Sequence, residues 1–242
     1  LGDRAGLEVR LSSALDSLWV AYQPIVAFEH RQVLAYEALV RNEEPTLRSP
    51  LDLFDAAERL GRLHEVARRI RSRVAADARG LPEGVLLFVN VHPEDLNDFD
   101  LFSPSSALSE IANRVVLELT ERASLDRVAG LQTRIGKLRE LGFRIALDDL
   151  GAGYAGLSSF TLLQPDYVKL DASLIRSVDA SPQKRSIVRA MLQLAAGDLN
   201  LKAICEGVET AAERDTLVAL GGDLLQGYLF ARPNRGFVDP QW

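Results

Sequence analysis

Polar residues interrupt or follow nearly every apolar run of this chain, and most are of types that bind divalent metal ions. Buried like charges repel one another, so such a set needs a cation among its members. Oxygen ligands without imidazole or thiolate favour Mg2+ or Mn2+ over Zn2+. The set consists of Glu37, Asn90, Glu118, Asp148, Asp149, Lys169, Glu206 and Gln226.

Two adjacent carboxylates, Asp148 and Asp149, would allow one side chain to bridge two ions while its neighbour binds only one. Two divalent ions about 3.5 to 4 Å apart suit phosphoester hydrolysis, because they lower the pKa of a water and hold the phosphate. Lys169 could orient that water or stabilise the transition state. An alternative is a proton-abstraction enzyme of the enolase type with Lys169 as base, although that superfamily adds a separate capping domain for which this chain has little room.

The elements that must position these residues are eight apolar runs with strand composition. Only a few residues around His30 separate the first two, which predicts an antiparallel hairpin. The predicted strands are Trp19 to Ala27, Val33 to Val40, Val85 to Val91, Val115 to Thr120, Phe143 to Asp148, Tyr167 to Asp171, Lys202 to Cys205 and Leu224 to Phe230.

Stretches with helical spacing separate the later strands, and alternating strands and helices predict a mainly parallel sheet. Eight strands in one domain of this length favour an α/β fold of the modified TIM (β/α)8-barrel type that opens with the hairpin. The apolar helix positions are Leu53, Ala56, Ala57 and Leu60; Leu63, Val66, Ala67 and Ile70; Val128, Leu131, Ile135 and Leu138; and Ile187, Ala190, Met191, Leu194 and Ala195.

The alternation of side chains along the strands indicates where the polar residues point. Asn90 shares a face with Leu86 and Phe88, and Lys169 shares one with Tyr167. Val116 and Glu118 also share a face, as do Ala146 and Asp148. We expect all of these faces to line the barrel axis. Ile145, Leu147, Val168 and Leu170 should then face the helices.

Composition limits the class of protein. The 242 residues carry 34 acidic and 28 basic side chains, a net charge of −6, which disfavours binding of long nucleic acids. No apolar run exceeds five residues, so no transmembrane helix is expected, and the single cysteine excludes an internal disulfide. We expect one domain over residues 1–242, cut from a longer protein, with no visible signal peptide.

At the polar residues the sequence resembles the EAL domain family of bacterial phosphodiesterases, which open cyclic di-GMP to linear 5′-pGpG. The resemblance covers about the whole chain, and its motifs occur in family order. They are YEALVR at 36–41, FVNVHP at 88–93, ELTE at 118–121, DDLGAGYAGL at 148–157, VKLD at 168–171, EGVET at 206–210 and QGYLF at 226–230.

The resemblance implies a role for each matching residue. One Mg2+ or Mn2+ ion would be bound by Glu37, Asn90, Glu118 and Asp148, and the other by Asp148, Asp149 and Glu206. Lys169 would contact the catalytic water and Glu121 would steady the loop after the paired aspartates. The residues that would contact cyclic di-GMP, or support its contacts, are Gln23, Leu39, Arg41 and Gln226.

The departures from the family pattern lie in that loop, where the usual sequence is DDFGTGYSSL. This chain has Leu150, Ala152 and Ala155-Gly156 instead of Phe, Thr and two serines. We expect a changed rate or metal affinity rather than lost activity. Two other functions stay open: a cyclic di-GMP receptor without turnover, and an interaction module that binds neither nucleotide nor metal.

The resemblance also implies partners and a location. Family members commonly dimerise through the loop at 148–157 and nearby helices, which predicts a homodimer here. Sensory domains, fused or separate, would supply the signal. We expect the domain to work in the cytoplasm.

Overall fold

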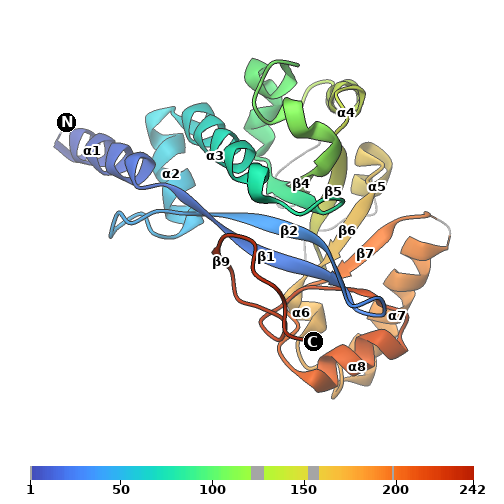
Figure 1. Cartoon of the computed structure of the whole chain (residues 1–242). Coiled ribbons are helices and arrows are strands. Elements are labelled where there is room, and N and C mark those ends of the chain that lie inside the picture. Colours follow the sequence, from blue (N-terminus) through green and yellow to red (C-terminus); the bar gives the residue numbers. More distant parts are fainter. Residues whose placement is uncertain (1, 121–127, 152–157, 198) are drawn as a thin grey trace.

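The structure is a computed structural model that describes residues 2–120, 128–151, 158–197 and 199–242. Its centre is a closed barrel of eight strands, which confirms the predicted fold class (Figure 1). The strands are β1 (Trp19–Ala27), β2 (Gln32–Arg41), β3 (Leu86–Asn90), β4 (Val115–Thr120), β5 (Arg144–Leu150), β6 (Tyr167–Leu170), β7 (Lys202–Cys205) and β8 (Leu224–Leu225).

The first strand gives the barrel its departure from regular (β/α)8 order. From β2 to β8 each strand is parallel to the next, whereas β1 is antiparallel to both of its barrel neighbours, β2 and β8. The predicted hairpin is therefore confirmed. A short ninth strand, β9 (Asn234–Arg235), pairs with β1 outside the barrel order.

Helices cover the outside of the barrel. They are α1 (Gly2–Asp16), α2 (Pro50–Leu60), α3 (Leu63–Asp77), α4 (Leu131–Glu140), α5 (Ser158–Leu163), α6 (Ala172–Ile175), α7 (Pro182–Ala196) and α8 (Ala211–Ala219). Short 3-10 helices span Ala78–Gly80, Pro93–Asn97, Phe99–Phe102 and Ser109–Arg114. Among the described residues no helix has the length and apolar character needed to span a membrane.

Local sequence accounts for the helix ends. Ser49 accepts a hydrogen bond from the Asp52 amide at the start of α2, and Gly61 ends that helix with a φ of 69°. At α8, Thr210 and Glu213 each accept a hydrogen bond from the other's backbone amide, which forms a capping box.

The strand faces are as predicted, and they produce two apolar layers. Inside the barrel, below the mouth, Ile25, Ala35, Phe88, Val116, Ala146, Tyr167 and Ile204 form one buried cluster. Phe88 meets the ring of Tyr167 edge to face at a centroid distance of 5.1 Å. The outer layer, which includes Ile145, Leu147, Val168 and Leu170, packs against the helices.

The last predicted strand is too long. The strand pairing of β8 ends at Leu225, because the chain then turns across the end of β7. The Gln226 amide donates to the Cys205 carbonyl, and the Leu229 amide donates to the Val208 carbonyl. Gln226 therefore lies in a loop above the strand. In the other direction, β5 continues two residues beyond its predicted end, to Leu150.

The buried face of helix α7 matches the prediction only in part, at Ala195 and at the partly buried Met191. Val188, Leu192 and Ala195 are buried, whereas Ile187 and Ala190 are exposed. Two overlapping apolar stripes run along this helix, and their spacing is similar. Packing against the barrel buries the stripe that contains Val188 and Leu192. At α4, Gly130 with a φ of 65° precedes Leu131, so the helix begins after Val128.

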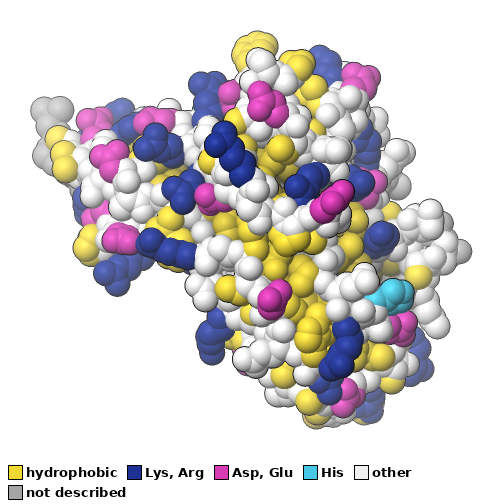
Figure 2. Space-filling view, viewed as in Figure 1, with side chains coloured by type: hydrophobic (Ala, Val, Ile, Leu, Met, Phe, Trp, Pro, Cys, Tyr) yellow, Lys and Arg dark blue, Asp and Glu magenta, His cyan; other side chains and the backbone are white. Residues whose placement is uncertain are grey.

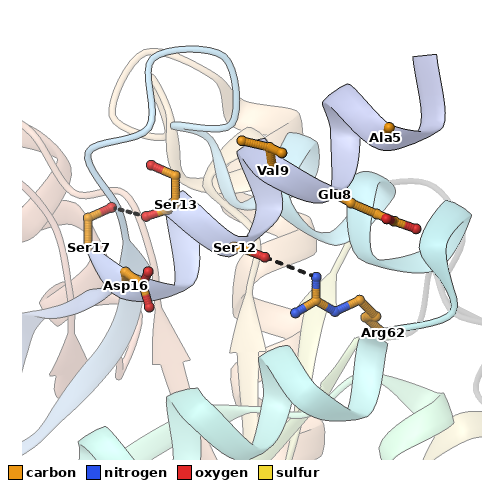
Figure 3. Close-up of a pocket in the computed structure, with 8 residues that line it drawn as sticks. All are labelled: Ala5, Glu8, Val9, Ser12, Ser13, Asp16, Ser17 and Arg62. Carbon is orange, nitrogen blue, oxygen red and sulfur yellow. Dashed lines mark hydrogen bonds between the residues drawn. The ribbon is translucent and has the colours of Figure 1, made fainter. Parts of the chain in front are cut away.

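Helix α1 was not predicted, although its buried residues Leu7, Leu11, Ala14 and Leu15 have helical spacing. It packs against α2. Beside it lies an open groove of about 900 Å³, lined by residues of α1 together with Ser17 and Arg62 (Figure 3). None of the predicted site residues lines this groove, so the chemistry must be sought at the barrel mouth.

Candidate functional site

The predicted polar residues that the structure describes meet at one end of the barrel. Strands β3 to β6 carry their polar residues at or near their C-terminal ends, Glu37 lies in the middle of the longer β2, and Glu206 follows β7 directly. Strand pairing brings the residues together in register: Gln23 lies opposite Glu37, and Asn90 lies beside Glu118. The mouth of a parallel barrel is where its loops and strand ends build active sites.

Lys169 is the centre of this arrangement. Its side chain is 1% exposed, and its Nζ atom lies 2.6 Å from Glu118 Oε1 and 2.6 Å from Glu206 Oε1. Glu37 Oε2 lies 3.3 Å away and Asp148 Oδ1 lies 3.7 Å away. One ammonium group therefore faces four carboxylates. When these are ionised, the negative charge is in excess and further cations can bind.

Burial and mutual repulsion change the protonation of these groups. Burial raises the pKa of Glu118 well above its ordinary value, and burial raises that of Glu206 to about 8. For Lys169, burial works against the charged form, but the surrounding carboxylates outweigh it and raise the pKa of the ammonium. Without further cations, burial therefore favours the protonated forms of Glu118 and Glu206.

Side-chain amides hold the carboxylates in place. Asn90 Nδ2 donates to Glu37 Oε1 at 3.3 Å and to Glu118 Oε2 at 3.1 Å. Gln226 Nε2 donates to the other oxygen of Glu37 at 2.6 Å and to Gln23 Oε1 at 3.2 Å. Glu37 is therefore held from both sides, and this pairing of Glu37 with Gln226 was not predicted.

The backbone of β5 is distorted at the two adjacent aspartates, Asp148 and Asp149. The register of β5 with β6 shifts between Leu147 and Leu150, and Asp149 adopts a φ of 62°. The Asp149 amide donates to Asp148 Oδ1 at 2.8 Å. In a regular strand consecutive side chains point to opposite faces, so a bulge is the local device that can re-aim one of them. A strained conformation in a non-glycine residue is typical of functional sites.

The donor set fits hard divalent cations. Carboxylate oxygens and the Asn90 amide are ligands that Mg2+ and Mn2+ prefer, and they come from separate strands that converge on one point. Gln226 Oε1 is buried in the mouth without a hydrogen bond to any described atom. Orphaned acceptors of this kind are satisfied by a cation, a water or a ligand.

Two hollows adjoin the mouth, but only the smaller one is lined by carboxylates of the group around Lys169. One, of about 300 Å³, is lined by Gln23, Glu37, Glu206 and Gln226 among others. The other, of about 510 Å³, is mainly apolar and extends past Asn90 between β2 and α2. Leu39 lines both hollows, which places it where a ligand spanning them would have to pass.

Arg41 ends β2 two residues after Leu39, so the two residues share a face of the strand, although Arg41 lines neither hollow. Its Nη1 atom donates to the Val40 carbonyl at 2.8 Å, and it pairs across the hairpin with Trp19. Glu121 and residues 152–157 of the predicted dimer loop lie outside the described part of the chain, so their predicted roles stay predictions.

Several residues at the mouth were not predicted. Tyr228 lines the smaller hollow, with the guanidinium of Arg232 4.2 Å from its ring centre. Arg176 and Glu209 form an ion pair at the same hollow. Tyr228 lies within the run at 226–230 and could have been found there, whereas Arg176 follows α6 with no local signal.

In the larger hollow, His92 lies over the Phe54 ring with centroids 6.4 Å apart and planes 13° apart. Its Nδ1 atom accepts a hydrogen bond from the Glu94 amide, so this histidine caps the following 3-10 helix.

Comparisons with known proteins show which proteins this chain is similar to. The EAL domain family matches residues 8–233. The cyclic di-GMP phosphodiesterase PdeR of Escherichia coli strain K12 is 32% identical over 247 residues, which cover 98% of this chain and 37% of PdeR. The chain spans between 29% and 44% of the length of three curated relatives that it matches.

Solved structures are similar over nearly the whole chain. The manganese and cyclic di-GMP complex of Klebsiella pneumoniae BlrP1 has a TM-score of 0.81 and 32% identity, and the match covers 93% of this chain and 58% of BlrP1. A standalone EAL protein from Vibrio cholerae O395 bound to cyclic di-GMP has a TM-score of 0.75 and 28% identity, with 93% and 95% covered.

Proposed function

The chain belongs to the EAL domain family, and we propose that it hydrolyses cyclic di-GMP to linear 5′-pGpG with the help of two divalent metal ions. The observation that carries the proposal is the single ring of oxygen donors around Lys169 at the barrel mouth. Relatives named as cyclic di-GMP phosphodiesterases, and similar structures that hold cyclic di-GMP, support the same substrate.

The proposed ligands divide the ring between two ions. Glu37, Asn90, Glu118 and Asp148 would hold the first, and Asp148, Asp149 and Glu206 the second. Bound Mg2+ or Mn2+ would supply an acidified water and charge for the phosphate oxygens. The BlrP1 complexes with calcium or manganese support a requirement for divalent cations.

The chain's own residues then orient the reaction. Hydrolysis to 5′-pGpG joins the water oxygen to phosphorus and breaks the bond from phosphorus to the 3′ oxygen, which leaves with a proton. Lys169, which carries its proton on a buried Nζ atom, would orient the water and stabilise the growing negative charge. Gln226 and Asn90 donate hydrogen bonds to Glu37 and would hold it in place for metal binding.

The two hollows suit a ligand with two bases joined through phosphates. Gln23 and Gln226 line the smaller one, Leu39 borders both, and Arg41 follows Leu39 on the same face of β2. We propose these four residues as contacts or supports for cyclic di-GMP. Glu121, outside the described residues, would steady the loop that follows Asp149.

The proposal is tested by incubating the protein with cyclic di-GMP and Mg2+ or Mn2+ and separating the products by chromatography. We expect 5′-pGpG from the wild type and none from Glu37→Ala. Glu29→Ala is the matched control, because this exposed glutamate lies in the hairpin turn at the other end of the barrel. Intact substrate after long incubation at high enzyme concentration would refute the proposal.

The second candidate is a cyclic di-GMP receptor without turnover, favoured by the departures at Leu150, Ala152 and Ala155-Gly156 in the loop after the paired aspartates. Calorimetry that finds tight binding of the dinucleotide while the products stay absent would support it. We propose further that the domain forms a homodimer through residues 148–157 and nearby helices, answers to sensory domains and works in the cytoplasm. Sedimentation of the purified domain tests the dimer.

A further inference from the structure

The barrel has an incompletely paired seam beside the candidate site. Strand β1 pairs with β2 from Trp19 to Ala27, but it pairs with β8 only at Val26 and Ala27, the end away from the mouth. Within the described chain, the mouth half of β1 therefore has no partner from β8. That half carries Gln23.

The C-terminal segment occupies this side of β1, and we name residues 231–238 the C-terminal strap. Figure 1 shows this dark red segment crossing the β1–β2 hairpin. Through β9 it pairs with β1, Tyr22 lying opposite Asn234 and Ala21 opposite Arg235. The strap thus supplies the edge pairing that β8 does not.

Phe237 anchors the strap between two tyrosines of the hairpin. Its ring centre lies 4.5 Å from that of Tyr22 and 5.0 Å from that of Tyr36, with interplanar angles of 49° and 52°. The Tyr36 hydroxyl also donates to the Val238 carbonyl at 3.1 Å. In the space-filling view, hydrophobic side chains form a band over this part of the molecule (Figure 2).

These contacts lie one residue away from the candidate site. Side chains alternate along a strand, so Tyr22 and Tyr36 face outward while their neighbours Gln23 and Glu37 face the mouth. The strap also reaches the mouth directly, because Gln23 Nε2 donates to the Ala231 carbonyl at 2.9 Å. A chain of hydrogen bonds then leads from the strap through Gln23 and Gln226 to Glu37.

We propose that the C-terminal strap, anchored by Phe237, closes the β8–β1 seam and positions Glu37 and Gln23 for metal and substrate binding. Phe237 is thus a positioning residue, and this role rests on the proposed function. Residues that orient metal ligands from outside typically change metal affinity about 10- to 100-fold when they are removed.

The test is the affinity for Mn2+, measured by electron paramagnetic resonance, which needs no turnover. We expect Phe237→Ala to weaken Mn2+ binding about 10-fold, in the range typical of residues that support metal ligands, and Phe237→Leu to restore most of it. Phe102→Ala is the control, because this partly buried phenylalanine packs against the core on a 3-10 helix that contains no site residue. It should lower the melting temperature without changing the affinity.

The position of the strap is followed separately through Trp19. Arg235 of the strap lies over the Trp19 ring, 4.3 Å from its centre, and Trp242→Phe leaves Trp19 as the only tryptophan. We expect Phe237→Ala to change Trp19 emission. Tyr36→Phe removes only the hydroxyl contact with Val238, so it should change the Mn2+ affinity and the Trp19 emission in the same direction by a smaller amount. This variant replaces Phe237→Ala in the test if Phe237→Ala does not fold.

A changed Trp19 emission with unchanged Mn2+ affinity would overturn the positioning role, and unchanged emission would overturn the anchoring role of Phe237. If the wild type binds Mn2+ but leaves cyclic di-GMP intact, the proposed activity fails while the strap test keeps its meaning.

Discussion

Replacing Lys169 by methionine removes the cation that four carboxylates share. The side chain is almost fully buried, and methionine retains most of its volume, so the change is mainly one of charge. Removing one partner of a buried ion pair typically costs about 3 to 5 kcal/mol. In a domain of this size each kcal/mol shifts the melting temperature by about 2 to 4 °C, so we expect a fall of about 6 to 20 °C in EDTA.

The loss should depend on pH and on metal. At pH 6 more of the carboxyl groups are protonated than at pH 8, so Lys169→Met should destabilise the metal-free protein less at pH 6. Mn2+ can take over the lost positive charge, so it should raise the melting temperature of the variant more than that of the wild type. A ligand at 100 times its dissociation constant stabilises by about 2.7 kcal/mol.

Differential scanning calorimetry in EDTA and in Mn2+, at both pH values, measures these effects. Lys137→Met, on the exposed face of α4, is the control and should leave all four melting temperatures nearly unchanged. Equal melting temperatures for Lys169→Met and wild type in EDTA at pH 8 would refute the inference that this ammonium holds the carboxylates together.

Three further predictions concern the mouth. Burial raises the pKa of Glu206 to about 8 from an ordinary 4.5, so its contribution to stability is present below pH 4.5 and is lost as pH rises towards 8. In EDTA, Glu206→Gln should therefore reduce the dependence of the free energy of unfolding in urea on pH between 4.5 and 8. Asp149→Asn keeps a residue type that tolerates a φ of 62°, so it should fold normally but bind one Mn2+ ion instead of two by calorimetry, and an unchanged stoichiometry would contradict its proposed role. Gly227→Ala would bring a Cβ atom within 2.0 Å of the Val208 carbonyl oxygen, so it should cost at least about 1 to 3 kcal/mol in urea unfolding and weaken Mn2+ binding through Gln226.

The features that could be predicted from sequence are those set by local periodicity. Alternation along single strands placed Glu118, Asp148 and Lys169 on the inner face, and the structure brings all three together. Helix α7 shows the limit of this reasoning, because its two apolar stripes are equally regular in sequence. Only packing against the barrel decides that Val188 and Leu192 are buried and Ile187 is not.

The seam could not be predicted for a different reason. Whether Leu225 ends a strand depends on how β8 meets β1, and those segments lie some 200 residues apart in the chain. The hydrogen bond from Gln226 to Glu37 and the contact of Phe237 with Tyr22 and Tyr36 are consequences of that closure. No local pattern encodes them, although each acts directly on a predicted site residue or on its neighbour.

The charges of the mouth show how an acidic protein would bind an anionic dinucleotide under the proposed function. When Glu37, Glu118, Asp148, Asp149 and Glu206 are all ionised, their charge outweighs that of Lys169 by four, and two divalent ions would cancel the difference. Without metal, burial raises the pKa of Glu118 and that of Glu206, which favours their protonated forms and so a lower charge at the mouth. Metal binding must then release protons. Cyclic di-GMP, with two phosphodiester charges, should therefore bind weakly in EDTA and gain affinity with each ion bound.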